Sequence, residues 1–84
     1  MDKIVEEAIR ESVRAQIWVS GFIRQVKEGR IELTKEKLME ELGRIEKAKK
    51  MIRECEHQAV ALPLEREDWD EIERELWGLV IERL

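Results

Sequence analysis

The sequence has little of the chemistry that builds tight turns, strands and disulfides. Its 84 residues include no asparagine, no tyrosine, one proline, one cysteine and four glycines. A single cysteine excludes an internal disulfide framework, and so few turn-forming residues argue against a fold of many short strands. The longest apolar stretch, residues 15–23, falls far short of the roughly 20 residues that span a bilayer.

Charge and helix-forming residues are abundant instead. Charged side chains make up 43% of the chain, and Glu, Lys and Arg dominate them, which favours helices. The scarcity of thermolabile amides resembles the composition of hyperthermophile proteins, and a designed helical protein would share it. Acidic residues follow Met1 at once, so we expect no signal peptide. We therefore predict one all-α domain, residues 1–84, that is thermostable and cytoplasmic.

The first predicted helix, residues 2–28, is the most apolar segment, and Gly29 is the left-handed residue that ends it. Its apolar side chains cover about 260° of the helix circumference, whereas an ordinary surface helix shows one narrower stripe. We expect two further helices of one chain to leave part of this surface uncovered. Large exposed apolar patches mark interaction sites, so we predict a homodimer, most simply with two-fold symmetry. The predicted interface comprises Ala15, Trp18, Val19, Phe22 and Ile23.

The other two helices follow from local signals at their ends. The hydroxyl of Thr34 can cap a second helix, which Leu33 and Leu38 would close as a hydrophobic staple, and Pro63 ends it. A third helix begins at Leu64 or at a capping box formed by Asp68 and Glu71, and both starts are open.

These elements predict a three-helix antiparallel bundle, or a helical hairpin with a shorter third helix, completed by dimerisation. In the dimer, small residues such as Ser12, Ser20 and Gly21 would let two backbones approach closely, and Gln16 could meet its symmetry mate. The predicted core comprises Val5, Ile9, Val13, Val19, Ile23, Leu38, Leu42, Ile45, Ile52, Cys55, Ala59, Ile72, Leu76 and Val80.

Candidate catalytic and metal-binding residues are few. Glu54 and His57 have the Glu-x-x-His spacing that di-iron helical bundles use. Such a site also needs inward-facing glutamates from other helices, and His57 lies far from the apolar stripe and should point to water. Cys55 diverges too far from His57 to act with it as a nucleophile or to share a zinc ion. We therefore expect no metal or cofactor, and we interpret Cys55 as a small core residue.

The charge pattern gives no sign of a nucleic-acid partner. Residues 47–53 include a basic cluster, but its members fan around the helix and the chain has a net charge of −4. Residues 65–84 carry eight acids and three bases. The acidic third helix is thus expected to lie near the basic middle of the second, with an acidic surface for a basic partner as the alternative.

One resemblance bears on function. The segment Leu76-Trp77-Gly78-Leu79-Val80-Ile81-Glu82 is similar to part of the last helix of the small all-helical chorismate mutases. Arg10 and Lys27 have the separation of two cationic substrate-binding positions in that family's first helix. The resemblance implies an intertwined dimer with active sites between subunits. This chain departs from the family at Gly29, where the family's first helix continues.

Two functions of different class follow. We favour a non-enzymatic, self-associating helical module that binds protein, such as a small regulatory, viral or mobile-element factor. The alternative is a small enzyme with an intersubunit active site, for which Arg10, Lys27 and Glu54 are the candidate polar groups. An enzyme requires charged groups that converge on a pocket, whereas a binding module shows them dispersed over an open surface.

Overall fold

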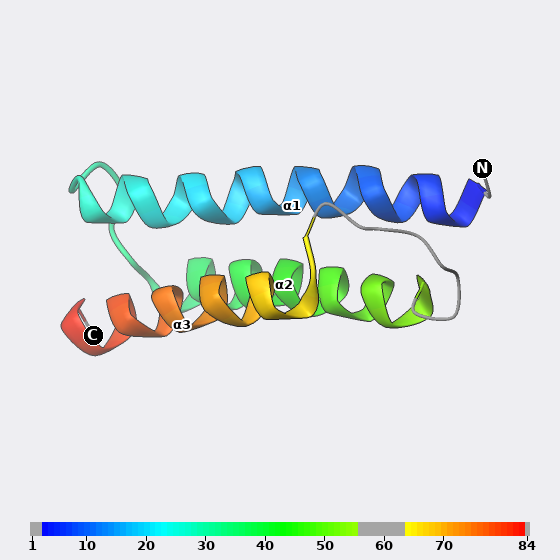
Figure 1. Ribbon diagram of the computed structural model, residues 1–84. Helices are drawn as coiled ribbons and strands as arrows, with labels where there is room; N and C mark the ends of the chain where they lie inside the picture. Colours follow the sequence, from blue (N-terminus) through cyan, green and yellow to red (C-terminus); the bar gives the residue numbers. More distant parts are fainter. Residues whose placement is uncertain (1–2, 56–63, 84) are drawn as a thin grey trace.

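A computed structural model, which describes residues 3–55 and 64–83, confirms the all-α fold of three helices (Figure 1). Helix α1 spans Lys3–Lys27, α2 spans Lys35–Cys55 and α3 spans Arg66–Arg83. Helices make up 88% of this described part, which contains no strand. The molecule is a rod measuring 42 × 18 × 18 Å. None of the described helices is both long enough and apolar enough to cross a membrane.

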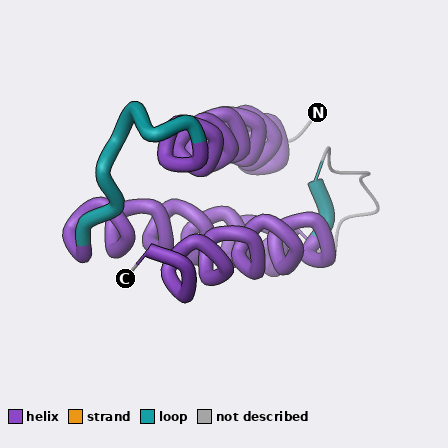
Figure 2. Tube along the Cα trace, turned by 90° about the vertical axis from the view of Figure 1, so that its left-hand side faces the viewer, coloured by secondary structure: helices purple, strands orange, loops and turns teal. Residues whose placement is uncertain are grey.

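The three helices run along the rod with neighbours reversed in direction. α2 returns antiparallel to α1, and α3 runs antiparallel to α2 (Figure 1). Viewed from the end, α1 lies over the pair formed by α2 and α3 (Figure 2). Because α3 starts opposite the middle of α2, it accompanies only the C-terminal part of α1 (Figure 1). The third helix therefore leaves the other end of the α1–α2 pair uncovered, as its short length predicts.

The first helix ends at a Schellman motif centred on Gly29. Gly29 has a φ of +77°, in the left-handed region that glycine adopts without a Cβ clash. The N–H of Arg30 donates to the carbonyl oxygen of Gln25 at 2.9 Å, and the N–H of Gly29 donates to that of Val26 at 3.1 Å. These two bonds satisfy carbonyls that the helix end would leave unpaired, and they confirm Gly29 as the stop signal.

The start of α2 also follows its prediction. The hydroxyl oxygen of Thr34 accepts a hydrogen bond from the backbone N–H of Lys37 at 3.2 Å, which is the geometry of an N-cap. Leu33 and Leu38 on either side of the cap are both buried in the main core. The predicted end of this helix at Leu62 and Pro63 lies outside the described residues.

The third helix begins between its two predicted starts. The carboxylate of Asp68 accepts a hydrogen bond from the backbone N–H of Glu65 at 2.8 Å. Asp68 is therefore the third residue of α3, and Glu65 is its N-cap. The predicted capping box with Asp68 as the cap is therefore wrong. Asp68 takes the third helical position, and its side chain makes the one bond that reaches back to the cap residue.

Most of the predicted core is confirmed, with one clear error. The predicted residues that are buried are Val5, Val19, Ile23, Leu38, Ile45, Ile52, Cys55 and Leu76, whereas Ile9, Leu42, Ile72 and Val80 are only partly buried. The prediction for Val13 is wrong, because 37% of this residue is exposed. Ala59 lies outside the described residues. The predicted core omitted seven apolar residues that are buried, namely Ala8, Phe22, Val26, Leu33, Ala48, Trp69 and Leu79.

Candidate functional site

The five residues predicted to form an interface occupy different surroundings on α1. Val19, Phe22 and Ile23 pack in the main core of the chain, and Ala15 is partly buried against it. Trp18 alone among the five is an exposed side chain, with 57% of its surface accessible. Ile17 is 64% exposed beside it, although the prediction did not include it.

Exposed apolar residues in the middle of this helix form an outer face, whereas Ile4, which is 60% exposed, lies on a different side. Val13, Ile17 and Gly21 follow one another at intervals of one turn, and Trp18 lies next to Ile17. Residues four apart in a helix lie on one side, so this series forms a continuous stripe on the side away from the core. We call Val13, Ile17, Trp18 and Gly21 the outer stripe. The helices α2 and α3 cover these side chains less than they cover the inner face of α1.

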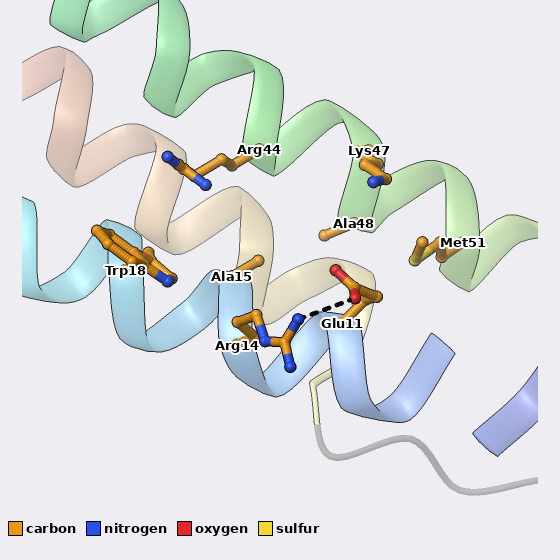
Figure 3. A pocket seen from close by; sticks show the side chains of 8 residues that line it. All are labelled: Glu11, Arg14, Ala15, Trp18, Arg44, Lys47, Ala48 and Met51. Carbon is orange, nitrogen blue, oxygen red and sulfur yellow. Dashed lines mark hydrogen bonds and ion pairs between the residues drawn. The ribbon is translucent and has the colours of Figure 1, made fainter. Parts of the chain in front are cut away.

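Trp18 is held from one side by a residue of α2. The guanidinium carbon of Arg44 lies 5.0 Å from the centroid of the indole ring, which is cation–π distance. Figure 3 shows Arg44 above the ring, with Ala15 and Ala48 where the two helices approach each other. The shallow cavity drawn there has a volume of about 90 Å³, and Glu11 on its rim forms an ion pair with Arg14 at 3.4 Å. Arg44 thus contacts one side of the Trp18 ring, which stays more than half exposed.

A second hollow lies on the other side of Trp18. It has a volume of about 400 Å³ and is open to solvent on one side. We call it the Gly21 groove, and its lining consists of Ile17, Trp18, Gly21, Phe22, Arg24, Gln25, Ile31 and Glu41. Its walls are mainly apolar, and polar groups stand at Arg24, Gln25 and Glu41, which is the usual construction of a recognition cleft.

Glu41 is a buried charge at the edge of this groove. It is 5% exposed, and burial raises the pKa of its carboxyl above the ordinary value, while the nearby Arg44 opposes that rise. Arg44 Nε lies 3.6 Å from Glu41 Oε2, an ion-pair contact that is slightly too long for a hydrogen bond between these two atoms. Neither of these atoms has another hydrogen-bond partner. The groove thus contains a polar group that the fold of one chain leaves incompletely satisfied.

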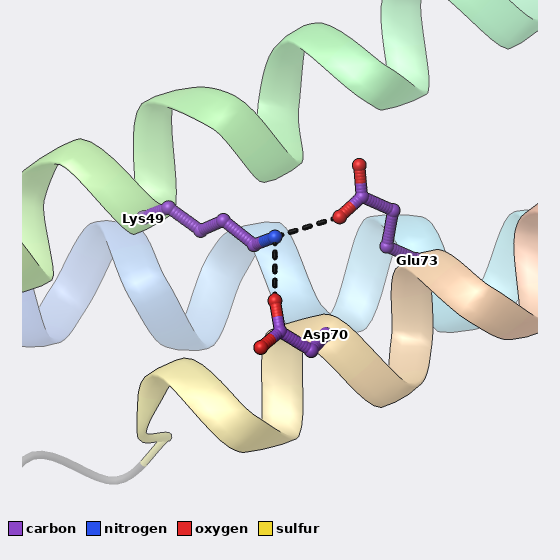
Figure 4. A network of polar contacts seen from close by, with 3 residues as sticks. All are labelled: Lys49, Asp70 and Glu73. Atoms are coloured by element: carbon purple, nitrogen blue, oxygen red, sulfur yellow. Dashed lines mark hydrogen bonds and ion pairs between the residues drawn. The ribbon is translucent and has the colours of Figure 1, made fainter.

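The acidic third helix pairs with the basic middle of the second, as expected. Lys49 Nζ contacts Asp70 Oδ1 at 2.7 Å and Glu73 Oε2 at 2.6 Å (Figure 4). These hydrogen bonds raise the pKa of Lys49 and lower the pKa of Asp70. On α1, Lys27 pairs with Glu75 at 2.6 Å. Part of the charge of α3 is therefore used within the chain.

The polar groups considered for an enzyme lie far apart in one chain. Arg10 and Lys27 are separated along α1 by about 26 Å at 1.5 Å per residue, and Lys27 is already paired with Glu75. Glu54 is exposed near the C-terminal end of α2. These three residues do not converge on one pocket of the described chain.

Cys55 is a buried free thiol, as predicted. It packs with Val5 and Ala8 in a small second cluster. His57 lies outside the described residues. Within residues 3–55 and 64–83, no group of three or more His, Cys, Asp or Glu side chains is placed to hold a metal ion. Comparison with known proteins gives no matching family model, no matching curated protein and no matching solved structure.

Proposed function

We propose that this protein is a helical interaction module that self-associates through the outer stripe of α1. The observation that carries the proposal is the exposure of Ile17 and Trp18, at 64% and 57%, on adjacent positions beside an apolar groove. Covering a large apolar side chain contributes about 1.5–3 kcal/mol. A small domain has little stability to spare, so two such neighbours are better explained by a covering partner than by isolated exposure.

The surroundings of Trp18 support a binding role for it. Energetic centres of protein interfaces are enriched in Trp and Arg and are surrounded by groups that exclude water. The pair of Trp18 and Arg44 contains both residue types, because Arg44 lies against the Trp18 ring. The ring is thereby oriented before any partner arrives, which lowers the entropy lost on binding. The remaining face of the ring is free to contact a second surface.

A stable contact would require more surface than the outer stripe alone. A standard interface buries about 800 Å² on each partner, roughly an eighth of the 6134 Å² that the chain exposes. Helix α1 is about 37 Å long at 1.5 Å per residue and extends along nearly the whole rod (Figure 1). The outer stripe lies in the middle of this helix, so an interface of standard size would also include charged residues of α1 on either side of it.

Analytical ultracentrifugation at micromolar concentration tests this proposal. The variant is Ile17→Glu, which keeps a helix-forming residue at an exposed position and should leave the monomer folded. Its matched control is Met39→Glu, because Met39 is 61% exposed on α2. We expect the wild type and Met39→Glu to sediment as dimers and Ile17→Glu to sediment as a folded monomer.

Two results would reject self-association through this face. One is a monomeric wild type over the whole concentration range. The other is a wild-type dimer that Ile17→Glu leaves intact. Circular dichroism of each variant confirms that a change in mass reflects lost contact and not lost folding.

A further inference from the structure

We propose that the charge of Glu41 holds Arg44 against the ring of Trp18, and that protonation of Glu41 releases this contact. The switch lies within one chain and does not depend on the proposed self-association. Its consequence falls on the outer stripe, because Trp18 is exposed there. The shape of that surface then depends on pH.

One guanidinium connects the other two residues of the switch. The guanidinium carbon of Arg44 lies 5.0 Å from the centroid of the Trp18 ring on α1, and Arg44 Nε lies 3.6 Å from Glu41 Oε2. Glu41 and Arg44 are three positions apart on α2, which places them on the same side of the helix. A change in the attraction between Glu41 and Arg44 therefore alters the contact of Arg44 with the ring.

Burial makes this attraction stronger than that of a surface ion pair. Glu41 is 5% exposed. Glu41 Oε2 and Arg44 Nε are both closed off from solvent, with no hydrogen-bond partner among the described residues. Water therefore does not screen the two charges as it does at the surface. The Arg44 side chain as a whole is 40% exposed, so its guanidinium can reach solvent when the attraction is lost.

The surroundings of Glu41 set the pH at which the switch responds. Burial raises the pKa of its carboxyl above the ordinary value of 4.5, the positive charge of Arg44 opposes that rise, and the negative charge of Glu40 adds to it. From α1, Arg24 lines the Gly21 groove together with Glu41 and is itself exposed, and Ile31 in the loop after α1 adds an apolar wall. Glu41 therefore takes up its proton at a pH above 4.5 as the solution is acidified.

Arg44 also faces a second carboxylate. The cavity between α1 and α2 that Arg44 lines is lined by Glu11, Arg14 and Lys47 as well. Glu11 forms an ion pair with Arg14 at 3.4 Å, and Lys47 is exposed on α2. The titration of Glu11 must therefore be distinguished from that of Glu41 in an experiment on Arg44.

A neutral Glu41 leaves little to keep Arg44 in place. A cation–π contact at an exposed ring is weak. Arg44 Nε has no hydrogen bond to the described residues in its present position, whereas it can bond to water in solvent. The guanidinium therefore moves outward in acid, and the Trp18 ring loses its cover on that side. The outer stripe then exposes more apolar surface below the transition than above it.

A pH titration of the folded chain by nuclear magnetic resonance tests the switch. The ring current of Trp18 shifts the signals of nearby protons, so the signals of the Arg44 side chain report whether it lies on the ring. We expect this shift to disappear as pH falls, at a midpoint above pH 4.5 that coincides with the midpoint of the Glu41 carboxyl carbon signal. Circular dichroism at each pH confirms that the helices stay folded.

Three substitutions assign the titrating group. Glu41→Gln keeps the size of the side chain and removes its charge, so the Arg44 signals should no longer titrate. At neutral pH, its ratio of ring-bound to released Arg44 should be about fivefold below that of the wild type, because charge-assisted contacts are roughly twice as strong as neutral ones. Glu40→Gln is the matched control on α2. It should keep the transition but move the midpoint to lower pH, because it removes a negative charge that raises the pKa of Glu41. Glu11→Gln should leave the midpoint unchanged.

Three results would reject the switch. One is a set of Arg44 signals that stay constant while the Glu41 carboxyl titrates, and another is a transition that survives in Glu41→Gln. The third is a transition that Glu11→Gln abolishes, because the response would then belong to the other carboxylate. The wild-type titration follows Glu41 and Arg44 in one folded chain, so it decides the question even if a variant fails to fold.

Discussion

The inner and outer faces of α1 have similar apolar side chains but opposite surroundings. Val19 and Val26 on the inner face are fully buried, and Ile23 is 4% exposed. Ile17 and Trp18 on the outer face are more than half exposed. The difference shows that apolar composition alone does not decide which side of a helix is covered, because the two helices of the same chain reach only one side.

The largest contrast between the faces is expected from introducing a charge. Val19→Glu would bury a carboxylate with no partner in the main core, which we expect to unfold the protein at a cost of about 4 kcal/mol or more. Ile17→Glu places the same group in solvent and should keep the helical circular dichroism spectrum. A folded Val19→Glu protein would show that the inner face is not a tightly packed core. Phe22→Glu should also unfold the protein, because Phe22 is 8% exposed. It is therefore unsuited to test dimerisation, since unfolding and dissociation would occur together.

A milder pair of substitutions measures the same contrast in packing. Ile23→Ala should destabilise the chain by about 2–5 kcal/mol, since it leaves a cavity. Ile17→Ala should change the stability of the monomer by less than about 0.5 kcal/mol. Urea unfolding at two protein concentrations provides the measurement. If the wild type is a dimer, its stability rises with protein concentration, and Ile17→Ala should reduce that rise. Equal losses of stability for Ile23→Ala and Ile17→Ala would contradict the assignment of the two faces.

Local signals made the ends of the helices predictable from sequence. Gly29 and Thr34 act through hydrogen bonds to residues within five positions of them, so their roles could be read without knowing the fold. Asp68 was misplaced within its capping motif because an acidic residue suits both the N-cap and the third helical position. The two positions differ only in the path of the backbone that precedes the helix.

The candidate site could be predicted only in part, because it depends on where α2 lies. The breadth of the apolar arc on α1 indicated an uncovered surface, and Trp18 is on it. Val13 was assigned to the core and Phe22 to an interface because periodicity gives angles around a helix but not the side on which its neighbours pack. The contact of Arg44 with Trp18 and the burial of Glu41 join residues distant in sequence, and no local pattern signals them.

Glu41, at the border between the two faces, provides a pH-dependent prediction. Burial holds its pKa above the ordinary value of 4.5 in the folded state. The folded protein therefore binds this proton more tightly than the unfolded chain, and the wild type loses stability as pH rises through the raised pKa. Glu41→Gln has no such proton, so its stability relative to wild type should increase from pH 4.5 to pH 7. Urea titrations at several pH values measure this, and a relative stability that falls with pH would contradict the burial of an unfavourable charge.

The ion pairs between α2 and α3 should give the smallest effect, because their side chains are more exposed than Glu41. Lys49 is hydrogen-bonded to Asp70 and Glu73, which raises the pKa of Lys49 and lowers that of Asp70. The contribution of Lys49 is full below its ordinary pKa of 10.5 and is lost above it, while that of Asp70 is present above 3.8 and is lost below it. Lys49→Met should thus lower stability slightly at neutral pH and low salt, and the loss should shrink with added salt. Lys50→Met, at an exposed neighbouring position, is the control in the same unfolding assay. An equal effect of the two substitutions would show that the pairing with α3 adds nothing to stability beyond general charge.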